Sequence, residues 1–351
     1  MANVFKSVNA DDITVTRTPL HEAIPLSGTI VSGTYPEDQG TSHTNIKNYS
    51  HGIFESVYDY PYLSSSANHI FDLSFGYSAN STISQSVSPD VTGYAGFQQD
   101  KKINIYNEMA QVLMGHDATG SIKEFKIPGG DYIREAVFVS FARLLSKDEI
   151  DKNNWSWKLN KKLAYAWTTA RAEMILDEIT LPTSNNETVF YTDSPAGEYS
   201  VLSSAMSGNV GLLFYQAGIA VLGTSSISQL TGTILGGGNI YNTMISSSIS
   251  ASCDSFRHHW ATQNFNNTTE LNSTIYFCRA NHNQFNYSAN PTYLTGSKIR
   301  VKASSLDQPV SYVTTVGLYS ADNELLATAK LSEPLKKTPD TELTLRVRLD
   351  Y

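Results

Sequence analysis

The C-terminal stretch 309–351 constrains the fold most, because its last segment alternates strictly between apolar and polar residues. From Leu343 to Tyr351 every second residue is apolar and the residues between them are polar. A period of two over this length predicts a half-buried β-strand. Upstream, 310–318 is rich in Val, Thr and Tyr, a turn signal follows at 320–323, and 324–331 predicts the returning strand of a hairpin. The chain is therefore predicted to end in a three-stranded antiparallel meander.

The rest of the chain predicts a β-rich α+β protein, with antiparallel sheets or β-sandwich-like modules and a few helices. A chain of 351 residues can bury a sizeable core and is expected to form two or three domains. Residues 1–57 lack helical periodicity and predict an extended N-terminal arm with loops. Residues 58–182 predict an α+β domain. Residues 183–351 predict a β-rich domain that ends in the meander.

Three segments give clear local signals. Apolar residues recur at helical spacing over 102–115, and Gly115 is expected to end that helix. The run 136–141 is almost wholly apolar, which predicts a strand buried on both faces. Trp155, Trp157 and Leu159 alternate, so they predict a strand with its aromatic side chains on one face.

Other segments are predicted with less support from periodicity. Ser146 with acidic residues after it predicts a helix start. The segment 164–179 fits a helix or a strand, and the helix is favoured. Residues 181–187 predict a linker, and the glycines at 236–238 predict a loop. The remaining expectations are strands at 188–192, 210–222 and 271–285, and a short helix at 240–249.

Composition limits the classes of partner. Hydrophobic residues make up 40% of the chain, as in a globular protein, whereas charged residues make up only 17%. Neutral hydrogen-bonding residues fill the difference, which is typical of β-rich assemblies. The formal charge is −8 and no run of Lys and Arg exists to follow phosphates, so no direct binding to nucleic acid is expected.

Cysteine usage and hydropathy predict assembly in the cytoplasm and no membrane contact. Cys253 and Cys278 are too few for a disulfide framework and match no zinc motif, so they are expected to be reduced thiols. The first residues lack an apolar core of signal-peptide length. No apolar run approaches the ~18 residues that a membrane span needs.

No catalytic, cofactor or metal site is predicted. His116 and Asp117 follow a helix end, where a histidine more often binds free carbonyls. His258 and His259 are adjacent and would point to opposite faces of a strand; two ligands are also too few for a metal site within one subunit. The glycines at 236–238 lack the spacing of a phosphate-binding loop.

Two segments contain candidate interface residues. Tyr58, Tyr60 and Tyr62 surround a proline, and such a cluster either packs beside a turn or anchors a partner. Leu335, Lys336 and Lys337 lie in a polar segment, 332–341, that is expected to be a loop. We expect this loop and the arm to contact neighbouring subunits, because both lack the pattern of the strands beside them.

The C-terminal residues TTVGLYSADNELLATAKLSEPLKKTPDTELTLRVRLDY, from 314 to 351, resemble the closing segment of virion structural proteins of tailed bacteriophages, including baseplate and tail-fibre components. Two internal stretches, NIYNEMAQVLMGHD at 104–117 and SPAGEY at 194–199, are similar to structural proteins of marine tailed phages. The resemblance implies a component of the virion, assembled in the host cytoplasm.

The resemblance therefore implies a non-enzymatic subunit of the baseplate or the neighbouring collar or neck, whose partners are other copies of itself and other virion proteins. An alternative is a receptor-binding module at the tail tip that recognises a host glycan, which would require exposed Trp or Tyr beside Asp or Asn. An enzyme such as a wall hydrolase would need converging carboxylates that the sequence does not place.

Overall fold

The computed structural model describes residues 5–32, 45–86, 98–161, 176–181, 183–184, 187–223, 230–233, 236–239, 244, 246–288, 294–295, 298–299, 304, 306 and 308–351. The chain divides into two compact units. The large unit is Leu20–Thr269; the small unit combines Met1–Pro19 with Glu270–Tyr351. The division falls within strands β1 (Ile13–Ser27) and β18 (Trp260–Ala280). The domain boundaries predicted after residues 57 and 182 remain predictions.

The large unit is built on one long antiparallel sheet. Its strands follow the order β18-β8-β9-β13-β14-β15-β7-β4-β3-β2. The strands that form this order and the helices that pack on it are β2 (Ile46–Asn48), β3 (Glu55–Tyr58), β4 (His69–Tyr77), β7 (Glu135–Phe141), β8 (Glu149–Asn160), β9 (Leu176–Thr180), β13 (Gly197–Ser204), β14 (Gly208–Phe214), β15 (Ile219–Gly223), α3 (Gln99–Leu113) and α7 (Ile249–His259).

Short elements complete the large unit. They are α1 (Gly28–Ser32), α2 (Thr82–Ser86), β5 (Phe125–Lys126), β6 (Tyr132–Ile133), α4 (Arg143–Ser146), β10 (Thr183–Ser184), β11 (Glu187–Thr188), β12 (Tyr191–Ser194), β16 (Thr231–Thr233) and β17 (Gly236–Asn239). Among the described helices, none is long and apolar enough to cross a membrane. The model is rich in strand with few helices, which confirms the predicted fold class.

Strands β4 and β7 are covered on both faces. Gly76 of β4 lies against the backbone of α3, where a Cβ would stand 2.7 Å from the Lys102 carbonyl oxygen. Its neighbour Phe75 points to the other face and meets Phe256 of α7, with ring centroids 6.0 Å apart. Because successive side chains of a strand alternate, α3 and α7 cover opposite faces of β4. Burial on both faces explains why β7 is almost wholly apolar, as predicted.

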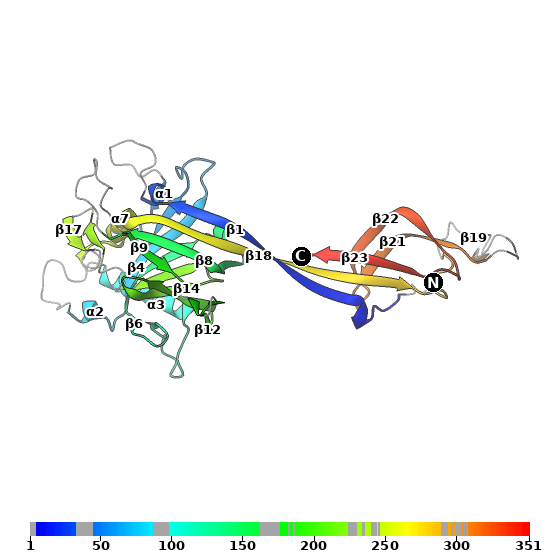
Figure 1. Ribbon diagram of the computed structural model, residues 1–351, viewed down its shortest axis with the longest axis horizontal. Helices are drawn as coiled ribbons and strands as arrows, with labels where there is room; N and C mark the ends of the chain where they lie inside the picture. Colours follow the sequence, from blue (N-terminus) through cyan, green and yellow to red (C-terminus); the bar gives the residue numbers. More distant parts are fainter. Residues whose placement is uncertain are drawn as a thin grey trace. The chain divides into compact units, whose positions relative to one another are not determined.

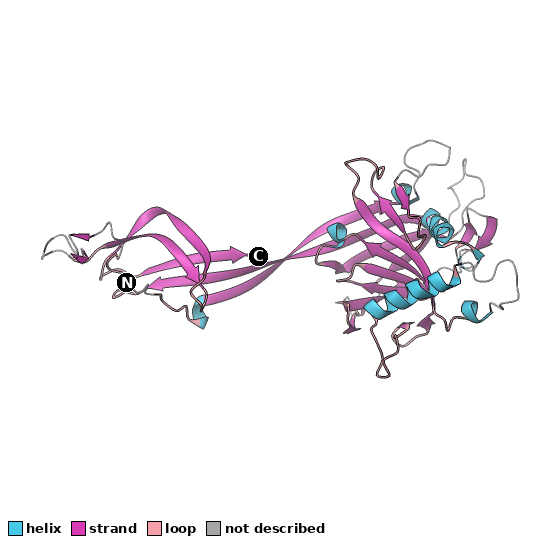
Figure 2. Ribbon diagram, turned by 180° about the vertical axis from the view of Figure 1, so that it is seen from behind, coloured by secondary structure: helices cyan, strands magenta, loops and turns pink. Residues whose placement is uncertain are grey.

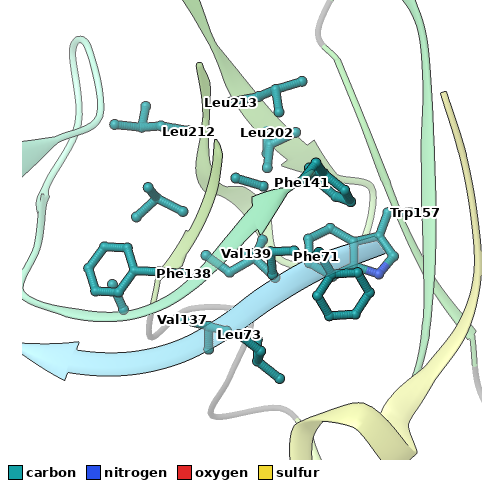
Figure 3. Close-up of a cluster of buried hydrophobic side chains, with 14 of the residues drawn as sticks. Phe71, Leu73, Val137, Phe138, Val139, Phe141, Trp157, Leu202, Leu212 and Leu213 are labelled. Atoms are coloured by element: carbon teal, nitrogen blue, oxygen red, sulfur yellow. The ribbon is translucent and has the colours of Figure 1, made fainter. Parts of the chain in front are cut away.

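An aromatic cluster joins strands that are far apart in the sheet order. Phe71 of β4 stacks on Trp260 of β18, with ring centroids 4.9 Å apart and planes 5° from parallel. Trp157 of β8 lies 4.5 Å from Trp260. Figure 3 shows Phe71 and Trp157 close together beside the apolar side chains of β7. The sheet therefore bends back on itself, and Trp155, Trp157 and Leu159 share the buried face that was predicted.

The helix predicted over 102–115 is confirmed as α3, which Figure 2 shows lying along the large unit. Gly115 ends it in a left-handed conformation (φ +73°), and its amide donates to the carbonyl of Ala110 at 3.1 Å. The strands predicted at 210–222 are also present, as β14 and β15.

The small unit holds β18 from residue 270, β21 (Ser311–Tyr319), β22 (Leu325–Lys337) and β23 (Leu343–Asp350), with the short β19 (Leu294–Thr295) and β20 (Lys298–Ile299) and the one-turn η1 (Ala10–Asp12). Strands β21 and β22 form the predicted hairpin, and β23 is the predicted last strand. In Figures 1 and 2 the hairpin lies beside β18 and β23.

The pairing of the last strand corrects the predicted meander. β23 pairs antiparallel with β18, from Ser273↔Asp350 to Ala280↔Leu343, whereas the sheet of β22 contains only β21. The physical reason is the length of β18: its 21 residues extend past β8 and leave eight consecutive positions for β23. A partner so far back in the sequence is not visible in the local pattern of 309–351.

Several local predictions are wrong. Ser146 ends the single turn α4 rather than starting a helix, and the acidic residues after it begin β8. Residues 236–238 lie in strand β17, which pairs with β16, and the expected loop 332–341 lies in β22 as far as Lys337. The N-terminal residues 13–27 form β1, a strand much longer than the short β-like pieces expected there.

Some predictions fall outside the described residues. They include most of the segment 164–179, of which only the last residues are described, as strand β9. They also include half of the helix expected at 240–249 and all of 33–44 of the N-terminal arm.

Substitution of Gly76 by Ala should destabilise the protein, because the added methyl meets backbone atoms of α3 that cannot move independently. Its Cβ would lie 2.7 Å and 2.9 Å from the Lys102 carbonyl oxygen and the Tyr106 amide nitrogen. We expect the free energy of unfolding to fall by about 1–3 kcal/mol, measured by denaturant unfolding. The control Asn104→Ala, on the exposed face of α3, should change it by less than about 0.5 kcal/mol. Equal stability of Gly76→Ala and the parent chain would contradict the close helix–sheet contact.

Candidate functional site: the apolar surface of the small unit

The small unit has almost no apolar core of its own. Of the 49 buried hydrophobic residues among the described part of the chain, only Leu318 and Val347 belong to it. By contrast, 14 of the 24 exposed large hydrophobic residues lie in the small unit, although it contains less than a third of the chain. Small β units of this kind rarely hold their fold without more buried area. The small unit therefore lacks the burial that its apolar residues could provide.

The local pattern explains how this surface arises. In β22 the residues that point to one side, such as Ala327 and Ala329, are half-buried, and those that point to the other side are exposed. The exposed side includes Leu326, whose side chain would normally be expected in a core. The hairpin therefore has apolar residues on both faces, and only one face is covered within the unit.

Three residues form a compact cluster on the exposed face, which we call the hairpin patch: Phe5, Tyr319 and Leu325. The rings of Phe5 and Tyr319 lie 4.7 Å apart, and Tyr319 pairs with Leu325 across the hairpin. A Cβ on Gly317 would stand 2.9 Å from the Tyr319 ring, so this ring lies flat over the glycine. The three side chains are 45%, 45% and 53% exposed. Exposed aromatic residues held in place by packing are typical centres of protein–protein interfaces.

Some charged groups of the small unit are paired within the unit. Lys6 donates to the Arg279 carbonyl at 2.6 Å, and Arg279 contacts Asp12 at 2.7 Å. At the other end of β23, Asp350 accepts from the Ser273 hydroxyl and from Arg348, and these two contacts lower the pKa of its carboxyl. Such pairs are worth little to stability when they are exposed.

The candidate interface residues of β22 differ in exposure. Leu335 is 36% exposed and Lys336 is exposed. Lys337 is fully buried; its ammonium donates to the carbonyls of His282 and Thr338 and to the side chain of Asn286, at 2.7–3.1 Å. Lys337 therefore anchors the end of β22 within its own unit, and a role at an interface stays a prediction for all three residues.

The tyrosine cluster lies in the large unit, around the end of β3. Tyr58 packs on His69 and Tyr62, with ring centroids 5.5 Å and 6.1 Å apart, and Tyr60 is 45% exposed. The packing that we weighed against a partner contact is thus present for Tyr58 and Tyr62, while Tyr60 is accessible to a partner.

A buried charged cluster in the large unit was not predicted. Arg257 of α7 and Glu55 of β3 are both fully buried and form an ion pair at 3.2 Å. Arg257 also pairs with Asp254 and donates to the Val31 carbonyl at 3.2 Å. Burial raises the pKa of Glu55 to about 7, with the positive charge of Arg257 acting against this shift. Because the partners lie 202 residues apart, no sequence spacing could have identified them.

The same region contains His258, His259 and Cys253, which were considered above as possible metal ligands or thiols. His258 and His259 lie in the last turn of α7, and their Nδ1 atoms contact the carbonyls of Asp254 and Asn160 at 2.6 Å and 2.5 Å. Cys253 is buried, which raises the pKa of its thiol. Nearby, the buried ammonium of Lys102 donates to the carbonyls of Met244 and Ser247 and so joins α3 to the residues before α7.

These buried groups connect elements of the core. Each polar partner named above is a backbone carbonyl or an oppositely charged side chain, which is how buried polar groups are usually accommodated. In the described parts of the chain, no group of three or more His, Cys, Asp or Glu side chains is arranged to hold a metal ion.

Comparison with known proteins gives no match: no family model, curated protein or solved structure matches this chain.

The stability of the protein should depend on pH through Glu55. Because its pKa is raised from 4.5 to about 7, the protonated form is favoured in the folded state. The contribution of Glu55 to the free energy of unfolding should be complete below pH 4.5 and should be lost as the pH rises through about 7. Its full size is on the order of 3 kcal/mol. Glu55→Gln resembles the protonated carboxyl, so the difference in unfolding free energy between the two proteins should change over this window. Parallel stability curves from pH 4.5 to 7.5 would contradict the assignment.

Proposed function

We propose that this chain is a structural, non-enzymatic subunit of a tailed-phage virion. It acts in the baseplate or the neighbouring collar or neck and assembles through symmetric protein–protein interfaces. Its partners are other copies of itself and other virion proteins. The observation that carries the proposal is the near absence of an apolar core in the small unit, together with its exposed apolar surface.

The physical argument starts from the cost of ordering a chain. Fixing the backbone of a residue costs roughly 1–2 kcal/mol in conformational entropy, which apolar burial must offset. A unit that buries only Leu318 and Val347 obtains little of this burial alone. Contact with neighbouring subunits would cover the remaining apolar side chains, as in assemblies whose subunit interfaces resemble a divided core.

The location in a phage particle is supported by the resemblance of 314–351 to closing segments of virion proteins. These residues form most of β21 and all of β22 and β23, and they include five of the 14 exposed large hydrophobic residues described in the small unit. The stretch that resembles assembly proteins thus contributes part of the exposed apolar surface of the small unit.

The alternative of glycan recognition has less support. Trp155, Trp157 and Trp260, the three tryptophans among the described residues, are all buried in the large unit. A sugar-stacking platform there would have to be built from tyrosines. We therefore propose one function, and glycan binding by the purified chain on an array would favour the alternative.

Removing the apolar side chains of the hairpin patch should weaken assembly. We expect the triple variant Phe5→Ser, Tyr319→Ser, Leu325→Ser to need a concentration at least about tenfold higher than the parent chain to associate, measured by analytical ultracentrifugation. The matched control Val112→Ser on α3 removes a residue that is 63% exposed in the large unit and should leave association unchanged. Thermal unfolding of each protein distinguishes lost assembly from lost folding. Association of the triple variant like that of the parent would contradict the role of the patch.

A cryo-EM map of the phage particle that carries this chain tests the location. Density for the chain in the baseplate, collar or neck is expected. Density at a tail tip would favour receptor binding, and absence of the chain from purified particles would overturn the proposed function.

A further inference from the structure

The N-terminal part of β1 is an exposed edge of the sheet. β1 stands at the end of the strand order, with β18 on one side and, among the described strands, none on the other. Every residue from Ile13 to Thr18 is exposed, including Val15 at 62%. This edge segment, 13–18, therefore has no partner strand on its outer side among the described strands, and its side chains are exposed.

The edge segment also lacks the features that usually keep sheet edges apart. Natural edge strands are shortened, charged, interrupted by proline or bulged. The segment contains five β-branched residues among six, and its one charge, Arg17, is paired with Glu270 at 3.4 Å. The first proline of β1, Pro19, comes directly after it. β-Branched residues favour a pleated strand, so the segment is well suited to pair with another strand.

Three of the other edges that the structure describes, those of β22, β23 and β2, are protected. In β22 the register steps from Val313↔Leu335 to Thr315↔Lys330, so residues 331–334 leave the ladder and Pro334 interrupts its donors. β23 carries Arg346, Arg348 and Asp350 along its length. At the far end of the large unit, β2 has only three residues. The edge segment is thus the one described edge of these four without protection.

We propose that the edge segment pairs with the same segment of a second copy of this chain, antiparallel and about a two-fold axis. This continues the β1–β18–β23 sheet across two subunits by strand addition. A two-fold axis brings a strand opposite itself in the antiparallel sense, so one segment supplies both halves of the new ladder. The inference rests on the proposed function, and it names the partner and the contact.

The distribution of charge favours a second copy as the occupant. The small unit carries 11 basic and 10 acidic residues and the large unit 14 and 23, which gives formal charges of +1 and −9. Copies that meet through their small units therefore meet with little net repulsion, whereas contact through large units would bring like charges together.

The test uses like and opposite charges on the full chain. Thr14 and Thr16 are replaced together, by Glu in one variant and by Lys in another. In an antiparallel pair centred on 14, 15 or 16, each variant places like charges opposite each other, so each alone should associate at least about tenfold more weakly than the parent. An equimolar mixture of the Glu and Lys variants should restore association, because opposite charges then face each other. The measurement is analytical ultracentrifugation, with differently tagged variants co-purified.

The control adds the same charge elsewhere. Asn104→Glu with Gln111→Glu places two negative charges on exposed positions of α3 in the large unit, and this variant should associate like the parent. Weaker association of both charge variants with rescue in the mixture supports the pairing. Unchanged association of the Glu and Lys variants, or failure of the mixture to restore it, overturns the pairing.

The outcomes also separate this inference from the proposed function. If the hairpin-patch variant dissociates while the charge variants associate normally, the self-pairing fails and assembly through the small unit stands. If the parent chain stays monomeric at every concentration tested and is missing from particles, both proposals fail.

Discussion

The stacking of Phe71 on Trp260 is the contact on which the large unit depends. In the strand order β4 and β18 are separated by six other strands, yet these two rings lie 4.9 Å apart and almost parallel. A flat sheet of this length would expose one apolar face along its whole length. Because the sheet bends back on itself, the side chains of β4, β7 and β8 share one core, and α7 is held inside the bend by Phe256. Aromatic residues are well suited to this role because each buries a large apolar area.

The two units obtain their order in different ways. Of the 49 buried hydrophobic residues among the described residues, the large unit contains 47, and it pairs its buried Arg257 with Glu55 and binds Lys102 through backbone carbonyls. The small unit has strands, hairpins and ion pairs but hardly any interior. Its strands therefore pair regularly, but many of their apolar side chains stay exposed. This combination is expected of a unit whose apolar side chains are covered by neighbouring subunits. The near-neutral charge of the small unit and the negative charge of the large unit follow the same division.

The sequence predicted those elements whose signal is local. Alternation identified β23 and the aromatic face of β8, and apolar spacing identified α3 and its end at Gly115. The sequence did not predict which distant segments pair with each other. Nothing in 309–351 shows that Leu343–Asp350 prefers β18, and nothing near Glu55 shows that Arg257 lies beside it. The apolar surface of the small unit was only partly predicted, since alternation tells which residues share a face but not whether that face is covered. Lys337 illustrates this limit: a lysine in a polar run was expected at the surface, yet it is buried by three carbonyl and amide oxygens.

The small unit combines N-terminal and C-terminal segments of the chain, and this affects the order in which the protein folds during synthesis. Residues 5–19 are synthesised before β18 and β23, with which they share the unit and which come about 250 and 330 residues later. The large unit can fold before residues 5–19 contact β18 and β23. Bringing together segments so far apart in the chain slows the formation of the small unit. A chain that stopped before β21 would lack Tyr319 and Leu325 of the hairpin patch, although it would keep Phe5 and the edge segment.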